Sequence, residues 1–212
     1  MFWQQLAFPW QVCLEEAWAA YCVGSLPIGA AITDRQGQLL SRGHNRIYDT
    51  HYTDNALWGT RVAHAEMNEL ASIDHRHVDL SEAILYTTTE PCPMCTGAIR
   101  MSLVGEVRYA SRDPVVGSVV FFEVSPFMQR GQCTIVPPED PDFEAILIAL
   151  IIEWVLRDQR PRVLALLHHW IGVSPAAGRL GEELYHTNQL QQWCADNTPT
   201  DEVIDALAER LM

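Results

Sequence analysis

The residues best suited to chemistry are one histidine, one glutamate and two cysteines, in two short segments. His64 and Glu66 are separated by a single residue, and Cys92 and Cys95 form a Cys-x-x-Cys pair directly after Pro91. The two sulfurs of such a pair can share one metal ion, and the start of a helix favours the thiolate that binds it. One His and two Cys supply three protein ligands. A tetrahedral zinc ion held this way keeps its fourth position for water, as catalytic zinc sites do.

A zinc ion in this setting lowers the pKa of its water toward neutrality and generates hydroxide. Hydroxide can attack a ring carbon that carries an amino group, but the departing amine must be protonated. Glu66 lies two residues from His64, so it can sit beside the water without binding zinc and carry the proton to the ring nitrogen and the amine. We therefore expect one zinc per chain, held by His64, Cys92 and Cys95, with Glu66 as the catalytic proton shuttle of a hydrolytic deaminase.

These residues match the H-x-E…P-C-x-x-C signature of zinc deaminases. The chain resembles the cytidine deaminase-like superfamily over about residues 5–125, and in particular its tRNA adenosine deaminase and guanine/cytosine deaminase branch. The resemblance implies substrate-binding roles for Asn45, Ala65 and Pro91, and it favours a homodimer. The segments that carry it are Pro27–Ala30, Gly43–Arg46, Glu90–Cys95, Gly97–Ala98 and Ala110–Asp113.

Two departures from that branch bear on the choice of substrate. Arg61 and Val62 stand where the branch usually has Pro-Thr, and the loop at 47–60 is longer than usual. Both lie at the mouth of the expected pocket. Guanine, cytosine, adenine, their nucleosides, a related aminated heterocycle and a tRNA anticodon base all fit the chemistry.

Plainer interpretations exist for each motif. The Cys-x-x-Cys pair could be half of a structural zinc knuckle or a redox pair, and Asn45 could simply turn the chain after a strand. The paired His168 and His169 are best interpreted as surface or packing residues. A deaminase fold can also serve as a non-catalytic binding protein, but that interpretation is disfavoured because all four chemical residues are present. Phe121, Phe122 and Phe127 are as consistent with core packing as with stacking on a substrate.

The order of elements predicts a three-layer α/β/α cytidine deaminase-like core with a mixed five-stranded sheet, followed by a helical appendage. A polar loop at 46–62 is long enough to be a lid. The expected helices of the core are 10–22, 64–73 and 93–103, and the expected strands are 28–33, 39–43, 83–87, 107–110 and 119–122.

Pro137 and Pro138 suggest a division into a zinc deaminase domain at 1–138 and a helical C-terminal extension at 139–212. We expect the extension to pack on the core or in a dimer interface. Its first helix, 142–157, is apolar nearly all round and must be covered by later helices or a second subunit. The later helices are expected at 162–171, 180–195 and 201–211.

Charge and cysteine content complete the expectations. The formal net charge is −13, all 14 basic residues are Arg, and no Lys occurs. A protein that binds a polyanion usually has a basic stripe, so a small diffusible nucleobase or nucleoside is favoured over tRNA, unless Arg42, Arg46 and Arg61 line one groove.

With no signal-like or membrane-spanning segment apparent, we expect a cytoplasmic protein that binds no membrane. Its cysteines should then be reduced, with Cys13, Cys22, Cys133 and Cys194 acting as small buried hydrophobes.

Overall fold

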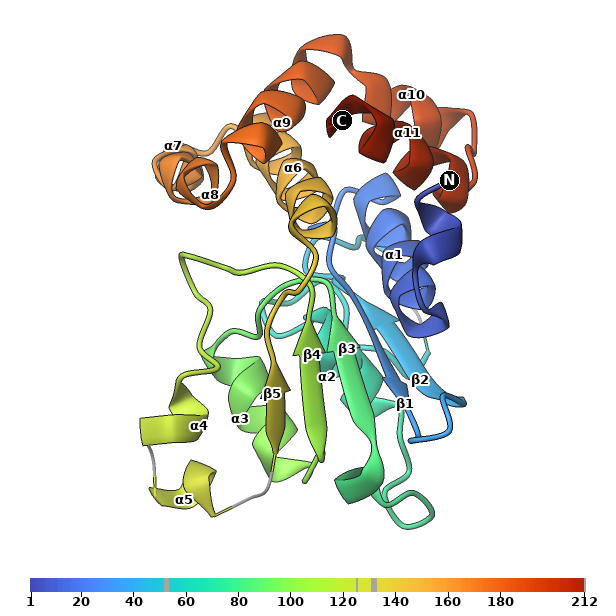
Figure 1. The fold of residues 1–212 in the computed structure, drawn as a ribbon, viewed down its shortest axis with the longest axis vertical. Helices are drawn as coiled ribbons and strands as arrows, with labels where there is room; N and C mark the ends of the chain where they lie inside the picture. The colour runs from blue at the N-terminus through green and yellow to red at the C-terminus, as the bar shows by residue number, and fades with distance from the viewer. Residues whose placement is uncertain (52–53, 125, 131–132, 212) are drawn as a thin grey trace.

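A computed structural model describes residues 1–51, 54–124, 126–130 and 133–211. A mixed five-stranded sheet occupies its lower half, and most of the C-terminal helices stack above the sheet (Figure 1). The strand order is β2-β1-β3-β4-β5, with β1 antiparallel to both β2 and β3, and with β4 parallel to β3 and β5. The strands are β1 (Gly29–Thr33), β2 (Leu39–His44), β3 (Ile84–Thr87), β4 (Glu106–Tyr109) and β5 (Thr134–Val136).

Helices cover both faces of the sheet because side chains along a strand alternate in direction. Ala31 and Tyr86 pack with α1 (Phe8–Cys22) in one apolar cluster. Ile32 and Leu85 point to the other face and pack in a second cluster with residues of α2 (Ala65–Ala71) and α3 (Pro93–Met101). This arrangement confirms the three-layer α/β/α core. Short elements complete it: η1 (Trp3–Gln5), η2 (Leu80–Glu82), α4 (Phe121–Val124) and α5 (Pro126–Gln129).

The C-terminal helices pack on the core through α6. This helix is buried along most of its length, with Ile148 and Ile152 almost fully inaccessible, in a cluster that also holds Leu14 and Trp18 of α1. Its neighbours α1, α9 and α11 lie in the same chain, so the apolar surface of α6 needs no second subunit to cover it. The homodimer and the boundary near residue 138 stay predictions. The C-terminal helices are α6 (Pro141–Asp158), α7 (Pro161–Leu164), α8 (Leu167–Val173), α9 (Pro175–Thr187), α10 (Gln189–Ala195) and α11 (Thr200–Leu211).

Three expectations about local structure were wrong. Residues 119–122 form no strand, because backbone hydrogen bonds from Phe121 to Ser118 and from Phe122 to Val119 close turns that lead into α4. The fifth strand is β5 instead. Two helices expected to be continuous are each divided. The break between α9 and α10 falls at Asn188, which adopts the left-handed conformation with φ 53°.

The cysteine expectation also needs correction. Cys22, at the end of α1, and Cys194, in α10, form a disulfide instead of standing as separate reduced thiols. The pair joins an N-terminal helix to a C-terminal one across a sequence separation of 172 residues. Cys13 is buried and Cys133 is half-buried, and both are free thiols. Among the described residues, no helix is both long enough and apolar enough to cross a membrane.

Candidate metal centre and active site

The beginnings of two helices bring the expected metal ligands together. His64 immediately precedes α2, and Cys92 immediately precedes α3, with Cys95 in the first turn of α3. Pro93 favours a helix start at this point because its fixed φ suits the first helical position. Gly43 in β2 lets α2 approach the sheet closely, because a Cβ at this position would lie 2.8 Å from the carbonyl oxygen of Ala65.

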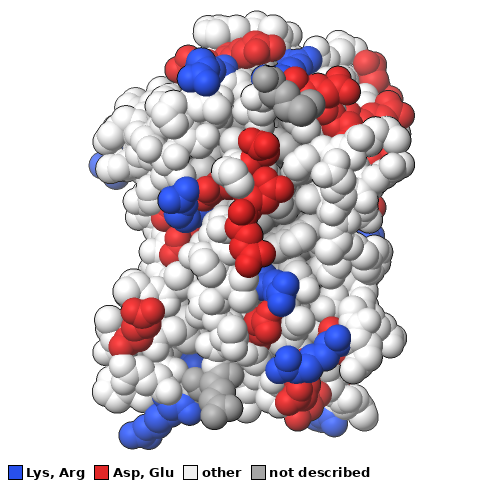
Figure 2. All heavy atoms as spheres, viewed as in Figure 1, with Lys and Arg blue, Asp and Glu red and all other residues white. Residues whose placement is uncertain are grey.

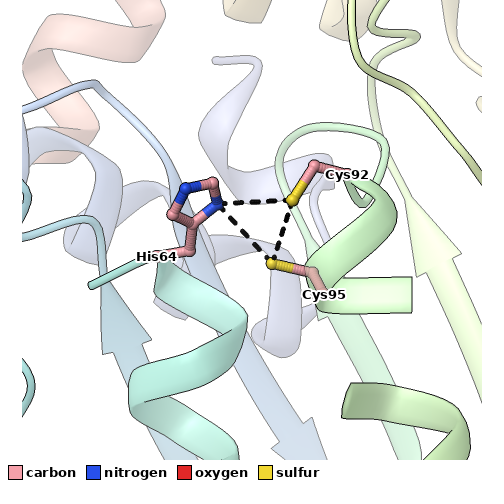
Figure 3. Close-up of side chains that lie close together, drawn as sticks. All are labelled: His64, Cys92 and Cys95. Atoms are coloured by element: carbon pink, nitrogen blue, oxygen red, sulfur yellow. Dashed lines mark hydrogen bonds between the residues drawn. The ribbon is translucent and has the colours of Figure 1, made fainter. Parts of the chain in front are cut away.

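The three ligand atoms form an almost equilateral triangle (Figure 3). His64 Nδ1 lies 3.6 Å from Cys92 Sγ and 3.6 Å from Cys95 Sγ, and the two sulfurs are 3.6 Å apart. Nitrogen and sulfur bound to zinc at about 2.0–2.3 Å in a tetrahedron would be about 3.5–3.8 Å apart. The spacing therefore fits one zinc ion, and this is the only set of at least three such ligands found among the described residues.

The electrostatics of the triangle favour the ligand form of Cys92. Hydrogen bonding from Cys95, together with that from His64, lowers the pKa of Cys92 to about 4 despite its partial burial. Burial disfavours the charged form of His64, but hydrogen bonding to Cys92 and the nearby charges outweigh it and raise the histidine pKa. These contacts therefore favour the thiolate of Cys92, which is the form of cysteine that binds metal.

Glu66 lies against the triangle without belonging to it. Its Oε2 is 3.4 Å from Cys95 Sγ, and its Oε1 is 3.5 Å from the hydroxyl of Thr87 on β3. The residue is 4% exposed, and burial raises the pKa of its carboxyl above the usual value. A carboxyl group with a raised pKa can both accept and return a proton near neutral pH, which is what a proton shuttle requires.

A cavity of about 270 Å³ lies against His64 and Cys92. Apolar side chains such as Leu26, Ile28 and Val116 form part of its wall, and polar groups interrupt that wall at a few places. Such a mixture of apolar walls and few polar groups is typical of small-molecule sites. The polar lining residues include Asn45, Thr89, Glu90 and Asp113.

Asn45 lines this cavity, and its side chain also turns the chain after β2. The residue is 1% exposed, and its Oδ1 accepts a hydrogen bond from the backbone N–H of Ile47 at 3.2 Å. The side chain therefore shapes the loop after β2 while bordering the cavity. Its contact with a substrate stays a prediction.

Ala65 and Pro91 are buried, and in the described part of the chain neither borders the cavity. The carbonyl of Pro91 accepts hydrogen bonds from the backbone N–H of Ser118 and from the hydroxyl of Thr96. These contacts fix the position of the segment that carries Cys92. Direct binding of a substrate by either residue stays a prediction.

Several cavity residues were not assigned a role from sequence. Glu90 and Asp113 lie within the segments quoted for the family resemblance, and burial raises the pKa of each carboxyl. Trp154 and Arg160 come from the C-terminal helices and also border the cavity, together with Tyr48 of the long loop. No sequence signal links positions 154 and 160 to a motif some 60 residues or more upstream, because only tertiary packing brings them there.

Other candidates lie away from the centre. His168 and His169 are exposed, with ring centroids 4.0 Å apart. Phe122 is buried in the core cluster beside α3, while Phe121 and Phe127 are exposed, and none of the three borders the cavity. These aromatic residues therefore have no contact with the candidate site.

Two of the three arginines that could have formed a phosphate clamp pair with acidic residues. Arg42 pairs with Glu15 and Glu16, and Arg46 pairs with Asp49. Neither Arg42, Arg46 nor Arg61 borders the cavity among the described residues. On the face of the molecule drawn in Figure 2, acidic side chains gather over the upper, helical part and arginines are scattered. That face carries no basic stripe.

An α/β/α fold with a His–Cys–Cys triangle and an adjacent carboxylate defines the class of zinc-binding deaminases. The sequence profile described as "Cytidine and deoxycytidylate deaminase zinc-binding region" matches residues 4–111. The chain belongs to this family.

Relatives within the family act on different substrates. The chain is 34% identical over 107 residues to a tRNA-specific adenosine deaminase of Rickettsia bellii, a match that covers 50% of this chain and 70% of that enzyme. It is 33% identical over 90 residues to a cytosine deaminase of Candida albicans, with 42% of this chain and 55% of that enzyme covered. It is also similar to a solved structure from a study of A-to-I editing by tRNA:A34 deaminases, with 28% identity, a TM-score of 0.51, and coverage of 61% of this chain and 95% of that one.

Proposed function

We propose that this chain is a zinc-dependent hydrolase that removes the exocyclic amino group of a nucleobase, a nucleoside or a related aminated heterocycle. One observation carries the proposal: the buried carboxylate of Glu66 lies 3.4 Å from a ligand of the zinc triangle, whose other ligands border a small cavity. The three ligand residues and Glu66 are thereby assembled at a site that a ring-sized substrate could enter.

The chemistry follows from what each group can do. Bound zinc supplies Lewis acidity, which makes water a nucleophile near neutral pH. Glu66 accepts one proton of the attacking water and passes it to the ring nitrogen, then accepts the second proton of the same oxygen and passes it to the amino group. The oxygen of water bonds to the ring carbon, the carbon–nitrogen bond to the amino group breaks, and the nitrogen leaves as ammonia. Asn45 and the apolar wall hold the ring in register with Glu66.

The polar groups of the cavity suit an aminated ring. Asp113 accepts backbone N–H groups of Val115 and Val116, and Glu90 accepts that of Val119. Both carboxyl groups are therefore held in place by the backbone while they border the cavity. Carboxylates are hydrogen-bond acceptors, so fixed carboxylates can receive the ring N–H and amino groups of such a substrate.

A small substrate is favoured over tRNA. Binding of a folded RNA relies on many phosphate contacts, and the net charge of −13 opposes it. Arg42 and Arg46 are paired with acidic residues, and neither borders the cavity. Deamination of a tRNA anticodon base is the alternative, and it is supported by the 34% identity to the Rickettsia enzyme.

A screen for released ammonia separates these candidates. Purified zinc-loaded protein would be incubated at moderate salt with cytosine, guanine, adenine, their nucleosides and an anticodon stem-loop. Turnover of at least one base or nucleoside supports the proposal. Turnover of the stem-loop alone would favour the alternative, and a fully metallated protein inactive on every compound would favour a binding protein.

A further inference from the structure

The C-terminal helices enter the candidate site at one point. Trp154 lies in the last turns of α6, and Arg160 lies just beyond its end, after Gln159 turns the chain with φ 60°. Both border the cavity that touches His64 and Cys92, which we call the inner cavity. A part of the chain outside the matched family segment therefore forms part of the wall of the site.

A second cavity of about 670 Å³, the outer cavity, shares part of its wall with the inner cavity. Tyr48, Trp154 and Arg160 border both cavities. The outer cavity is lined mainly by α1, α6 and α10, and the disulfide Cys22–Cys194 is part of its wall. The three shared residues thus form a partition between two spaces of different size.

The partition is held together by several contacts. The Tyr48 and Trp154 ring centroids are 5.5 Å apart, and the Arg160 guanidinium lies 5.2 Å from the centre of the Tyr48 ring. Arg160 also donates a hydrogen bond to the Tyr48 hydroxyl and pairs with Asp158. Trp154 is anchored separately, because its indole N–H donates to the carbonyl of Gly24 at 3.2 Å.

Size decides what fits beneath this partition. Pockets for drug-sized ligands are about 300–1,000 Å³, so the inner cavity of about 270 Å³ suits a ring system without a large substituent. A sugar that extends from the ring toward the outer cavity would meet the partition. At this part of the wall, the Arg160 guanidinium and the Tyr48 side chain are in direct contact.

We infer that Tyr48, Trp154 and Arg160 are specificity-determining residues that restrict the site to free aminated bases and exclude their nucleosides. The inference rests on the proposed deaminase function and adds the substrate class to it. Two of these residues, Trp154 and Arg160, lie outside the segment that the family profile matches. In this chain, the selection by substrate size therefore comes largely from the C-terminal extension. Arg160 is the part most easily displaced, because its side chain is about half exposed.

The test compares free bases with their nucleosides. For wild type, kcat/KM is measured on the pairs cytosine/cytidine, adenine/adenosine and guanine/guanosine. We expect turnover of a base and at least about tenfold lower turnover of its nucleoside, because a wall contact discriminates by about that factor or more. In Arg160→Ala, the nucleoside-to-base ratio of kcat/KM should rise by about tenfold or more.

A matched control and a milder variant show whether a change in the Arg160→Ala ratio comes from the partition itself. Arg162→Ala removes an exposed arginine of α7 that borders neither cavity, so the ratio should stay at the wild-type value. Tyr48→Phe keeps the ring and removes only the hydroxyl that Arg160 contacts, so it should shift the ratio in the same direction by less. Calorimetric binding of base and nucleoside to Glu66→Gln and to Glu66→Gln/Arg160→Ala proteins reports the same preference without turnover.

The outcomes separate this inference from the proposed function. If wild type deaminates a nucleoside as well as its base, or if Arg160→Ala leaves both the kinetic and the binding ratios unchanged, the size filter is refuted and the deaminase function stands. If the metallated wild type acts on no base and no nucleoside, the proposed function itself fails.

Discussion

The carboxylate of Glu66 lies 3.4 Å from the sulfur of Cys95 and is almost completely buried. A carboxylate in this position can exchange protons with a water held at the metal without binding the metal itself. We predict that Glu66→Gln retains zinc and the fold but loses at least about 10²- to 10⁴-fold in kcat, because a glutamine cannot carry protons. The measurement is ammonia release by variant protein of confirmed zinc content.

Glu69 provides the matched control for this variant. It lies one turn further along α2 and is fully buried, but it makes no contact with the zinc triangle in the described structure. Glu69→Gln should therefore stay within a few-fold of wild-type activity. Near wild-type turnover by Glu66→Gln would refute its role as proton shuttle, and equal losses in both variants would point to a structural effect of α2.

Metal content tests the ligand assignment directly. We predict about one zinc per chain in wild type, and loss of zinc in His64→Ala and Cys92→Ala, because two ligands cannot hold the ion as three do. The measurement is inductively coupled plasma mass spectrometry on dialysed protein. Cys133→Ala is the control, since Cys133 is a free thiol outside the triangle. A full complement of zinc in Cys92→Ala would overturn the assignment.

The disulfide predicts a contribution to stability. Cys22 and Cys194 close a loop of 172 residues, and removing a disulfide typically lowers the free energy of unfolding by about 2–5 kcal/mol. We predict a decrease in that range for Cys22→Ser/Cys194→Ser, measured by urea denaturation. Cys133→Ser should change it much less. An unchanged urea midpoint in the double variant, or two free thiols at these positions in the purified protein, would contradict the prediction.

The sequence carries strong local information about the metal site and weaker information about its surroundings. His64, Glu66, Cys92 and Cys95 were predictable because the spacing within each pair is local and the two pairs together match a known deaminase signature. Trp154 could not be assigned to the site, because its position there depends on how α6 packs against α1 and the loop after β2. Sequence reasoning could recognise the metal-binding motif but not the residues of the C-terminal extension that border the cavity.

Two errors have clear physical causes. Val119 and Val120 have high β propensity, but backbone turns close around them, so tertiary context overrides propensity. The pairing of Cys22 with Cys194 was missed because the cysteines were interpreted from the expected compartment. Two residues so far apart in sequence give no local sign that α1 and α10 meet.

The C-terminal extension predicts the outcome of truncation. Leu14, Trp18 and Tyr21 of α1 pack in one apolar cluster with α6, and the Tyr21 hydroxyl donates to the buried Glu153 at 2.6 Å. A chain that ends after Pro138 would expose this cluster, so we predict that it is insoluble or aggregated. The measurement is the soluble fraction followed by size-exclusion chromatography. A soluble and active truncation would show that the helices are dispensable for folding.

Glu69 also predicts a pH dependence of stability. Neither oxygen of its carboxyl has a hydrogen-bond partner in the described structure, and burial, followed by the charges of Glu66 and Glu16, raises its pKa well above the usual value. The folded protein therefore keeps a proton that the unfolded chain loses above about pH 4.3. From there up to the folded-state pKa, the free energy of unfolding should fall with rising pH by about 1.4 kcal/mol per pH unit for this proton.

Glu69→Gln removes that titration while keeping the size and shape of the side chain. We predict that the variant is more stable than wild type at pH 7 and that the difference shrinks as the pH is lowered toward 4.5. Urea denaturation at a series of pH values, with zinc content checked at each, gives the two slopes. The other buried carboxyl groups titrate in both proteins, so the difference in slope isolates Glu69. Parallel pH profiles would mean that Glu69 is not protonated in the folded state.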